Sequence, residues 1–286
     1  MLAAFSLQSS AAPPAPQGFL MQFEWKSDDP LFGGFSAIDI SQDGARVTLI
    51  TDRGAYGVGH ITRDAQGQIS AVDLAPLRML RGKGKDPLSK GRNDSEGLAI
   101  AADGTVYISF EGVARVLRYS RLDGEADNLP NHPDFAKLQR NSALEALAID
   151  AQGTLYTLPE RSGGLDTPFK IYRYKNGVWD TPFSLPREPG YLPVGADVGP
   201  DGRLYILLRH FLGISGFSSK LIRMELGASS LGPPEVMFQS PTGFHDNLEG
   251  VSVWRDRAGR LRATMVADNN FVPFLSSGIV EYALPD

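Results

Sequence analysis

Three glutamates stand at the beginning of strand-like segments that are otherwise apolar. Glu96 and Glu145 each lie eight residues before a turn glycine, and Glu249 lies ten residues before one because its turn, RDRAG, is longer. Burying such a carboxylate without a partner costs several kcal/mol. Carboxylates that converge on one point repel each other unless a cation lies among them, and hard cations such as Ca²⁺ prefer oxygen ligands. The residue types therefore favour a metal site, provided that the fold brings the three segments together.

The segments that carry these glutamates belong to an internal repeat. A hairpin pattern, with apolar and partly alternating runs on both sides of a short glycine-containing turn, occurs five times. The turn glycines are Gly44, Gly104, Gly153, Gly202 and Gly259. Each hairpin is followed by a third strand-like segment, and the first four hairpins are followed by a fourth as well. Four strands in each repeat predict an all-β fold, a β-propeller of five four-stranded blades.

The ends of the chain are expected to close this ring. The last repeat lacks a fourth strand, whereas the segment FLMQFEW (19–25) stands alone before the first hairpin. If this segment completes the last blade, the edges of the first and last sheets are protected. Two long gaps between repeats leave six blades as the alternative, although no sixth hairpin of this type is present. We expect one propeller domain over residues 18–286, preceded by a leader at 1–17.

In a propeller, the innermost strand of each blade lines a central channel. The aligned position at the start of these strands is occupied by Ser36, Glu96, Glu145, Val194 and Glu249. We expect four of these residues to bind Ca²⁺, namely Ser36, Glu96, Glu145 and Glu249. At Val194, a backbone carbonyl or a water molecule would have to replace the missing side-chain ligand. The alternative is that the glutamates are solvated strand ends or pair with nearby arginines.

A second set of polar residues stands where the second strand of each hairpin ends, and therefore on the same face. Carboxylates that would orient or deprotonate water there are Asp52, Glu111, Glu160 and Asp268. Residues that would bind the substrate are Arg53, Arg161, Arg209, His210 and Asn269. A guanidinium group can hold a phosphate or a carboxylate with two hydrogen bonds. The alternative is that these acids and arginines only pair with each other, and that His210 has a structural role.

The loop LRMLRGKGKDPLSKGR (77–92) carries six cationic residues and one aspartate, in a chain whose formal charge is −5. Because it connects one blade to the next on the same face, it indicates a small anionic substrate, although a solvated surface loop is the alternative. The acidic balance argues against nucleic-acid binding. No segment approaches the roughly 18 apolar residues of a membrane helix.

The chain has no cysteine, which excludes disulfides and thiolate chemistry. It also lacks the GxSxG and HExxH motifs, so attack by water with the help of a metal fits better than a serine nucleophile. The N-terminus MLAAFSLQSSAAPPAPQ is similar to the latter half of a secretory signal but lacks the cationic start. We expect a periplasmic or secreted monomer.

Several motifs resemble the bacterial "esterase-like activity of phytase" (phytase-like) family, over about Gly33 to Phe271. They are FGGFSAIDIS with TDRG, RNDSEGLAI with ISFEG, NSALEALAI with LPERS, DNLEGVSV, and DNNF. This resemblance implies hydrolysis of phosphate esters or of other esters.

A more remote similarity is to the calcium-activated nucleotidases (apyrases), which are five-bladed propellers with one central Ca²⁺. Ser36, Glu96, Glu145 and Glu249 match the ligand pattern of that family position by position. Val194 departs from it, where that family has another serine.

Three functions remain in competition at this point. The leading one is an exported, Ca²⁺-dependent hydrolase of phosphoric esters. The second is a lactonase or arylesterase on a metal-centred propeller, which would leave the arginines and the basic loop without a role. The third is a non-catalytic binding propeller in which the ion is purely structural.

Overall fold

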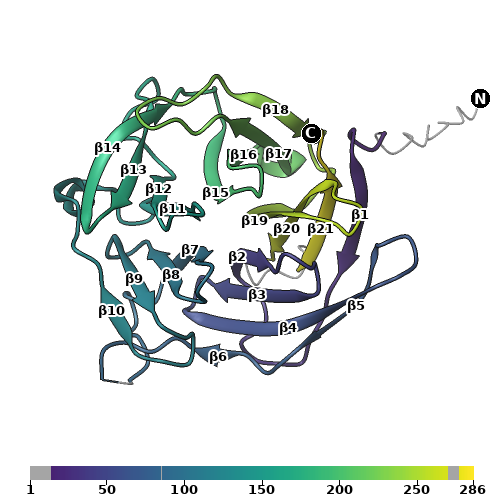
Figure 1. Ribbon diagram of the computed structural model, residues 1–286, viewed down its shortest axis with the longest axis horizontal. Coiled ribbons are helices and arrows are strands. Elements are labelled where there is room, and N and C mark those ends of the chain that lie inside the picture. Colours follow the sequence, from purple (N-terminus) through teal and green to yellow (C-terminus); the bar gives the residue numbers. More distant parts are fainter. Residues whose placement is uncertain (1–13, 85, 270–276) are drawn as a thin grey trace, which may run out of the picture.

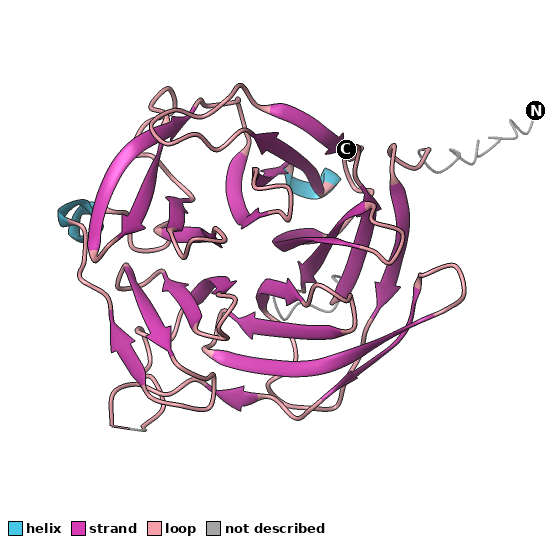
Figure 2. Cartoon of the chain, viewed as in Figure 1, coloured by secondary structure: helices cyan, strands magenta, loops and turns pink. Residues whose placement is uncertain are grey.

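Five antiparallel sheets surround a central axis in the computed structural model, which describes residues 14–84, 86–269 and 277–286 (Figures 1 and 2). Each sheet contains one of the five hairpins found in the sequence. The five-bladed propeller is thus confirmed, and the alternative of six blades is wrong.

The blades follow one another along the chain. The first contains β2 (Phe35–Ile40), β3 (Arg46–Thr51), β4 (Ala55–Arg63), β5 (Ile69–Leu74) and a short additional strand, β6 (Arg78–Met79). The second contains β7 (Ser95–Ile100), β8 (Val106–Phe110), β9 (Arg115–Tyr119) and β10 (Ala126–Asn128). The third contains β11 (Leu144–Ile149), β12 (Leu155–Pro159), β13 (Phe169–Lys175) and β14 (Val178–Leu185).

The fourth blade contains β15 (Leu192–Val198), β16 (Leu204–Phe211), β17 (Phe217–Met224) and β18 (Glu235–Gln239). The fifth contains β19 (Asn247–Arg255), β20 (Leu261–Asp268), β21 (Gly278–Ala283) and β1 (Phe19–Glu24). Two short 3₁₀ helices, η1 (Pro133–Lys137) and η2 (Gly213–Ser215), lie in connections.

The N-terminal strand closes the ring as expected. β1 pairs antiparallel with β21, with Phe19 opposite Tyr282 and Glu24 opposite Gly278 (Figure 1). The outer edge of β21 is therefore covered by the start of the chain, and β1 becomes the outermost strand of the last blade. Residues 1–13 of the expected leader lie outside the described residues, and the domain boundary before Gly18 remains a prediction. No helix in the described ranges is long and apolar enough to cross a membrane.

The innermost hairpins form because of their turn residues. All five turn glycines have a positive φ, between 72° and 86°. The amide of Gly104 donates to the carbonyl of Ala101 (2.9 Å), and the amide of Gly202 donates in the same way to Gly199 (2.8 Å). A turn followed by a residue in this left-handed region is a common hairpin connection, and glycine adopts that conformation without steric cost.

Each innermost strand carries a β-bulge at the same place. The ladder to the second strand is interrupted between Phe35 and Ala37 in the first blade and between Leu144 and Ala146 in the third. Equivalent interruptions occur in the other three blades. The residues left out of the ladder include Ser36, Glu96, Glu145, Val194 and Glu249. A bulge redirects side chains locally, so the five aligned positions share one backbone feature as well as one place in the sequence.

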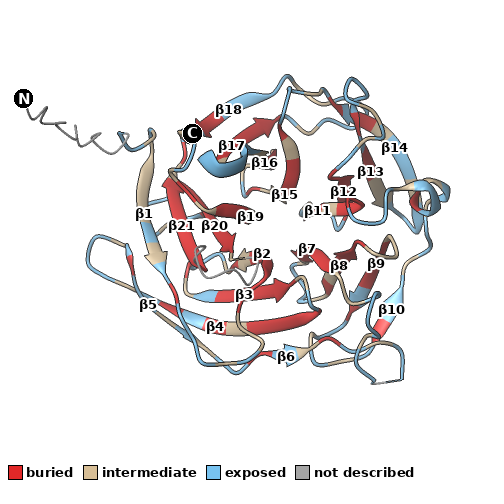
Figure 3. Cartoon of the chain, turned by 180° about the vertical axis from the view of Figure 1, so that it is seen from behind, coloured by how far each residue is buried: buried red, intermediate tan, exposed pale blue. Residues whose placement is uncertain are grey.

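Small residues follow the bulges because neighbouring blades approach closely there. A Cβ on Gly250 would lie 2.6 Å from the Cα of Ala37, and a Cβ on Gly195 would lie 2.4 Å from the carbonyl oxygen of Glu249. Outside this inner ring, apolar side chains form five clusters, each packed between two neighbouring blades. Figure 3 shows the buried residues concentrated in the inner and middle strands, with exposed residues on outer strands such as β5 and β10.

Candidate metal centre at one mouth of the channel

The ends of the second strands lie beside the starts of the first strands, on one face of the ring. The amide of Asp52 donates to the carbonyl of Gly34 (2.8 Å), and the amide of Glu111 donates to that of Asp94 (2.9 Å). In the fifth blade, Asn247 faces Asp268 in the ladder. The two sets of polar residues recognised in the sequence therefore gather at one mouth of the channel.

The second blade contributes a compact acidic cluster to this mouth. Carboxylate oxygens of Asp94, Glu96 and Glu111 all lie within 4.8 Å of one another. Glu96 and Glu111 are each only 8% exposed, whereas Asp94 is half-buried. Three carboxylates at this separation supply oxygen ligands of the kind that Ca²⁺ uses. Their negative charges also balance the two positive charges of the ion. The donor set therefore fits a hard divalent cation.

The pKa values of the carboxylates at this mouth also indicate that positive charge is lacking there. Burial, followed by the charges of Glu145 and Glu249, raises the pKa of Glu96 well above its usual value. Burial also raises the pKa of Glu111 to about 7, and the nearby carboxylate of Asp94 adds to this shift. The pKa of Glu145 is raised well above its usual value by burial and by the charges of Glu111 and Glu160. Without a cation, these groups hold their protons to higher pH than ordinary glutamates, and a bound cation would favour their charged forms.

Arg209 places a largely buried positive charge at this mouth. Its guanidinium donates hydrogen bonds to Asn247 Oδ1 (2.7 Å), to Glu160 Oε1 (3.0 Å) and to Glu249. Asn247 in turn donates to Glu249 Oε1 (2.8 Å). Burial disfavours the charged guanidinium, but the carboxylates of Glu249, Glu145 and Glu160 outweigh burial and raise the pKa of Arg209. The mouth therefore has two sides, with ion pairs around Arg209 and, in the described part of the chain, carboxylates without an ion pair at Asp94, Glu96 and Glu111.

Asp52 lies between these two sides. Burial raises its pKa to about 6, against the opposing charge of Arg53, and the charges of Glu249 and Asp94 contribute to the rise. Its Oδ1 is buried and accepts no hydrogen bond within the described ranges. Asp52 therefore has a carboxylate oxygen available for a ligand, together with a pKa near neutrality.

Of the four residues expected to bind the metal, only Glu96 belongs to the compact cluster. Glu145 interacts electrostatically with it, while Glu249 pairs with Arg209. Ser36 Oγ donates to the carbonyl of Ser95 (2.7 Å), the residue just before Glu96. In the fourth blade, Val194 is buried and offers no side-chain ligand, whereas Arg209 of the same blade reaches Glu249 of the ring.

The remaining candidate residues lie around the rim. Arg161 is half exposed, with its Nε 3.6 Å from Glu160 Oε2. Asn269 Oδ1 accepts a hydrogen bond from the amide of Gly34 (3.2 Å), and Asp268 is buried. The ring of His210 packs against Tyr191, with the ring centres 5.2 Å apart. The roles assigned to these residues from the sequence remain predictions.

The basic loop reaches the mouth at its C-terminal end. Asn93 Nδ2 donates to the carbonyl of Arg53 (2.7 Å) and thereby connects the first and second blades. A Cβ on Gly112 would lie 2.9 Å from the carbonyl of Gly91 and 3.8 Å from Asp94 Oδ2, so Gly91 is close to the acidic cluster. Lys85 of this loop lies outside the described residues.

A family model described as "Phytase-like: Esterase-like activity of phytase" matches residues 30–271. The chain belongs to the phytase-like family. The match covers all five innermost hairpins, and so includes the whole of the mouth described above. Asn270 and Phe271 of the DNNF motif fall within the match but outside the described residues. No protein with a curated function matches this phytase-like chain in sequence.

Solved structures share the propeller fold of this phytase-like protein at low sequence identity. The α-L-arabinofuranosidase PaAbf62A from Podospora anserina is 12% identical, with a TM-score of 0.52 over 94% of this chain and 96% of that one. The calcium-binding protein regucalcin from Agrobacterium tumefaciens is 11% identical, with a TM-score of 0.50 over 88% of this chain and 77% of that one. At these identities the likeness concerns the fold alone.

Two residues of the phytase-like site were not among those singled out from the sequence as functional. Asp94 and Asn247 belong to the polar residues that precede the glutamates, and the sequence predicts them at this mouth without assigning them a role. Both lie at the mouth because the bulges at Glu96 and Glu249 turn the chain there. A polar residue two positions before a bulged glutamate is the signal that would have identified them.

Proposed function

We propose that this phytase-like protein hydrolyses small phosphoric esters with the help of Ca²⁺ held at the acidic mouth of the channel. The observation that carries the proposal is the convergence of the carboxylates of Asp94, Glu96 and Glu111 beside a buried guanidinium. Membership of a family defined by esterase-like activity supports hydrolysis as the class of reaction.

The residues divide into three roles. Asp94, Glu96 and Glu111 would hold the ion, and Glu145 adds negative charge from the neighbouring blade. When bound, Ca²⁺ would supply positive charge to polarise a phosphoryl oxygen. Ser36 and Glu249 belong to the supporting ring, because Ser36 binds the backbone before Glu96 and Glu249 fixes Arg209.

The arginines account for an anionic substrate. Arg209 is held in place by three acceptors, which orient its guanidinium without removing all of its five donors. Arg161 and Arg53 lie at the exposed rim, where a phosphate group can replace water around them. A neutral ester would not need this positive rim.

Asp52 is the best candidate for the group that accepts the proton of the attacking water. Its pKa of about 6 lies close to neutral pH, where a general base is most effective. Its buried Oδ1 has no partner in the described ranges, so it can accept a hydrogen bond from water. Glu160 binds Arg209, and Glu111 belongs to the ion-binding cluster, so both are otherwise engaged.

The test compares two esters with the same leaving group. p-Nitrophenyl phosphate and p-nitrophenyl acetate would be assayed with Ca²⁺ and with EDTA, for the wild type, for Glu96→Gln and for the exposed control Glu24→Gln. The proposal predicts Ca²⁺-dependent hydrolysis of the phosphate, lost in Glu96→Gln and retained in Glu24→Gln. Faster hydrolysis of the acetate would favour the arylesterase or lactonase function.

A third outcome separates catalysis from binding. If neither ester is hydrolysed while Ca²⁺ still raises the melting temperature of the wild type, the ion is structural and the protein is a binding propeller. Export to the periplasm or the medium, and a monomeric state, are part of the same proposal. Fractionation of cells and sedimentation of the purified protein test them directly.

A further inference from the structure

A cavity of about 910 Å³ occupies the other mouth of the channel, away from the acidic cluster. Its wall includes the last residues of the five innermost strands, among them Ile40, Ile100, Ile149 and Val198. The wall does not include the residues at the opposite ends of these strands, Ser36, Glu96, Glu145 and Glu249. Its size is that of a site for a small molecule.

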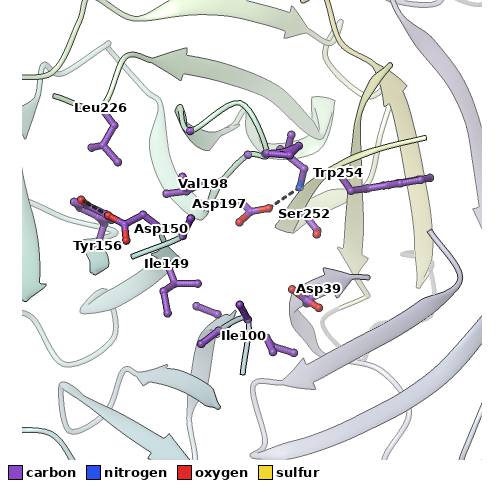
Figure 4. Close-up of a pocket in the computed structure, with 18 of the residues that line it drawn as sticks. Asp39, Ile100, Ile149, Asp150, Tyr156, Asp197, Val198, Leu226, Ser252 and Trp254 are labelled. Atoms are coloured by element: carbon purple, nitrogen blue, oxygen red, sulfur yellow. Dashed lines mark hydrogen bonds between the residues drawn. The ribbon is translucent and has the colours of Figure 1, made fainter. Parts of the chain in front are cut away.

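Three oxygen-bearing side chains stand at one level of this cavity. Three residues after the bulge, the fourth, fifth and first blades present Asp197, Ser252 and Asp39 respectively. Figure 4 shows these three labelled side chains around the same open space. The amide of Val253 donates to Asp197 Oδ2 (2.6 Å), and the amide of Ile40 donates to Ser252 Oγ (3.0 Å). These bonds connect neighbouring blades and fix the positions of both acceptors.

The two aspartates have no cationic partner. In residues 14–84, 86–269 and 277–286, neither Asp39 nor Asp197 forms an ion pair within 4.0 Å, and the carboxylate of Asp39 takes no hydrogen bond. The other acids of the wall are engaged: Asp150 accepts from Tyr156 (3.0 Å) and Asp201 from Tyr205 (2.8 Å). Asp39 lies deep in the channel and points into the cavity (Figure 4).

Burial raises the pKa of Asp39 to about 6, with the more distant charge of Arg46 opposing the shift. Burial raises the pKa of Asp197 to about 7, and the hydrogen bond from Val253 opposes this shift while the charge of Asp39 adds to it. For both carboxylates, burial thus outweighs the interactions that favour the charged form.

The second and third blades contribute an apolar strip at the level of Asp39 and Asp197, and Asp150, Gln152, Arg173 and Lys175 also line the cavity. At the same level, the second and third blades present only Ala99 and Ala148, and Ile100 and Ile149 follow them with partly exposed side chains. In Figure 4, Ile100 and Ile149 lie on one side of the space, and Asp197, Ser252 and Asp39 lie on the other. The small alanines leave room beside the aliphatic side chains, so at this level the inner strands offer oxygen atoms on one side and hydrocarbon on the other.

We propose that this cavity is a second binding site, which takes a primary amine with an apolar body. A primary ammonium group has three N–H donors and no acceptor, and the wall offers three oxygen acceptors from adjacent blades. The alkyl or aryl body would then cover Ile100 and Ile149 and remove apolar surface from water.

The experiment uses the full-length protein in EDTA at pH 8 and measures binding by calorimetry. The probes are hexylamine, which is charged at this pH, 1-hexanol, which lacks the charge, and hexanoate, which has the opposite charge. The proposal predicts one hexylamine bound per chain, with at least tenfold weaker binding of hexanol and none of hexanoate. From butylamine to octylamine, the affinity should rise with chain length.

Two variants locate the site. Asp39→Asn and Asp197→Asn should each weaken hexylamine binding at least tenfold, whereas Asp73→Asn, on the exposed outer strand β5, should not. The melting temperature of each variant reports whether it is folded, and the series of amines tests the wild type without any variant. Equal binding of hexanol and hexylamine, no binding of either, or affinity independent of chain length would each overturn the proposal. So would competitive displacement of hexylamine by Ca²⁺ in the wild type, because the site would then bind metal.

Discussion

The guanidinium of Arg209, on β16 of the fourth blade, binds the carboxylate of Glu249, on β19 of the fifth blade. The innermost strand of the fourth blade carries Val194 at the position that Glu249 has in the fifth. The fourth blade, which has no side-chain metal ligand at the aligned position, thus contributes a cation from its second strand. The arginine pairs with carboxylates of the third and fifth blades. The unpaired carboxylates are consequently concentrated on the side of the second blade, around Asp94, Glu96 and Glu111.

Replacement of Arg209 by methionine should strongly destabilise the metal-free protein. The change leaves the buried Glu160 and the half-buried Glu249 without this guanidinium, and breaking a buried ion pair from one side costs about 3–5 kcal/mol. Urea denaturation in EDTA measures this loss, with Arg257→Met at an exposed turn as the control. Unchanged stability of Arg209→Met would mean that the pair is not formed in solution.

Replacement of Asp52 by asparagine should lower kcat for the phosphate ester about 100-fold or more, with little change in KM, because general-base catalysis contributes this much. The wild-type pH profile of kcat/KM should show an acidic limb at or below pH 6, because Asp52 has a pKa of about 6 without metal and nearby Ca²⁺ lowers it; this limb should disappear in the variant. Asp73→Asn provides the matched control. A variant that retains wild-type kcat would remove Asp52 from the mechanism.

Asp39 and Asp197 should make the stability of the protein depend on pH. Their folded-state pKa values of about 6 and about 7 exceed the ordinary value of 3.8, so the folded protein keeps these protons to higher pH than the unfolded chain. The free energy of unfolding therefore falls as pH rises from about 4 to about 7, because the folded state binds more protons in this range.

The variant Asp39→Asn isolates one part of this effect. Arg46, Asp197 and the neighbouring Asp201 remain in place, and the variant should be more stable than the wild type by on the order of 2 kcal/mol at pH 8, but not at pH 4. Urea denaturation in EDTA at pH 4, 6 and 8 measures the difference. A difference that is constant with pH, or that has the opposite sign, would contradict the unpaired state of Asp39.

Replacement of Gly250 by alanine should destabilise the propeller by about 3 kcal/mol. The added Cβ would lie 2.6 Å from the Cα of Ala37 and 2.7 Å from the amide nitrogen of Ile38, and backbone atoms of a neighbouring blade cannot move aside without distorting it. Gly82→Ala is the matched control, because its Cβ would meet its nearest neighbours at 3.6 Å. Equal stability of the two variants would contradict the close approach of the first and fifth blades.

The sequence was sufficient to predict the number of blades, because a glycine turn between two apolar runs is a local signal for a hairpin. All five such turns form hairpins in the structure. Closure by residues 19–25 also followed, since the last repeat had an unpaired edge and this segment had no other partner. The gathering of both sets of polar residues at one mouth followed from hairpin geometry alone, because the end of a second strand must return beside the start of the first.

The partition of charge within the mouth did not follow from the sequence. In the comparison of the five repeats, Glu96, Glu145 and Glu249 occupy equivalent positions. In the structure their neighbours differ, because Arg209, which binds Glu249, lies on a second strand and not at the aligned position. Asp39 and Asp197 were missed for a related reason. Each stands inside an apolar strand, in the stretches AIDIS and GADVG, where a single polar residue is ordinarily read as an outward-facing position.

Calcium binding to the metal-free protein, measured by calorimetry, tests the central claim most directly. The account predicts one Ca²⁺ per chain in the wild type, binding weakened about tenfold or more in Glu111→Gln because a charged ligand is lost, and wild-type binding in the exposed Glu24→Gln. Failure of the wild type to bind Ca²⁺, or full retention of binding in Glu111→Gln, would contradict a metal centre at Asp94, Glu96 and Glu111.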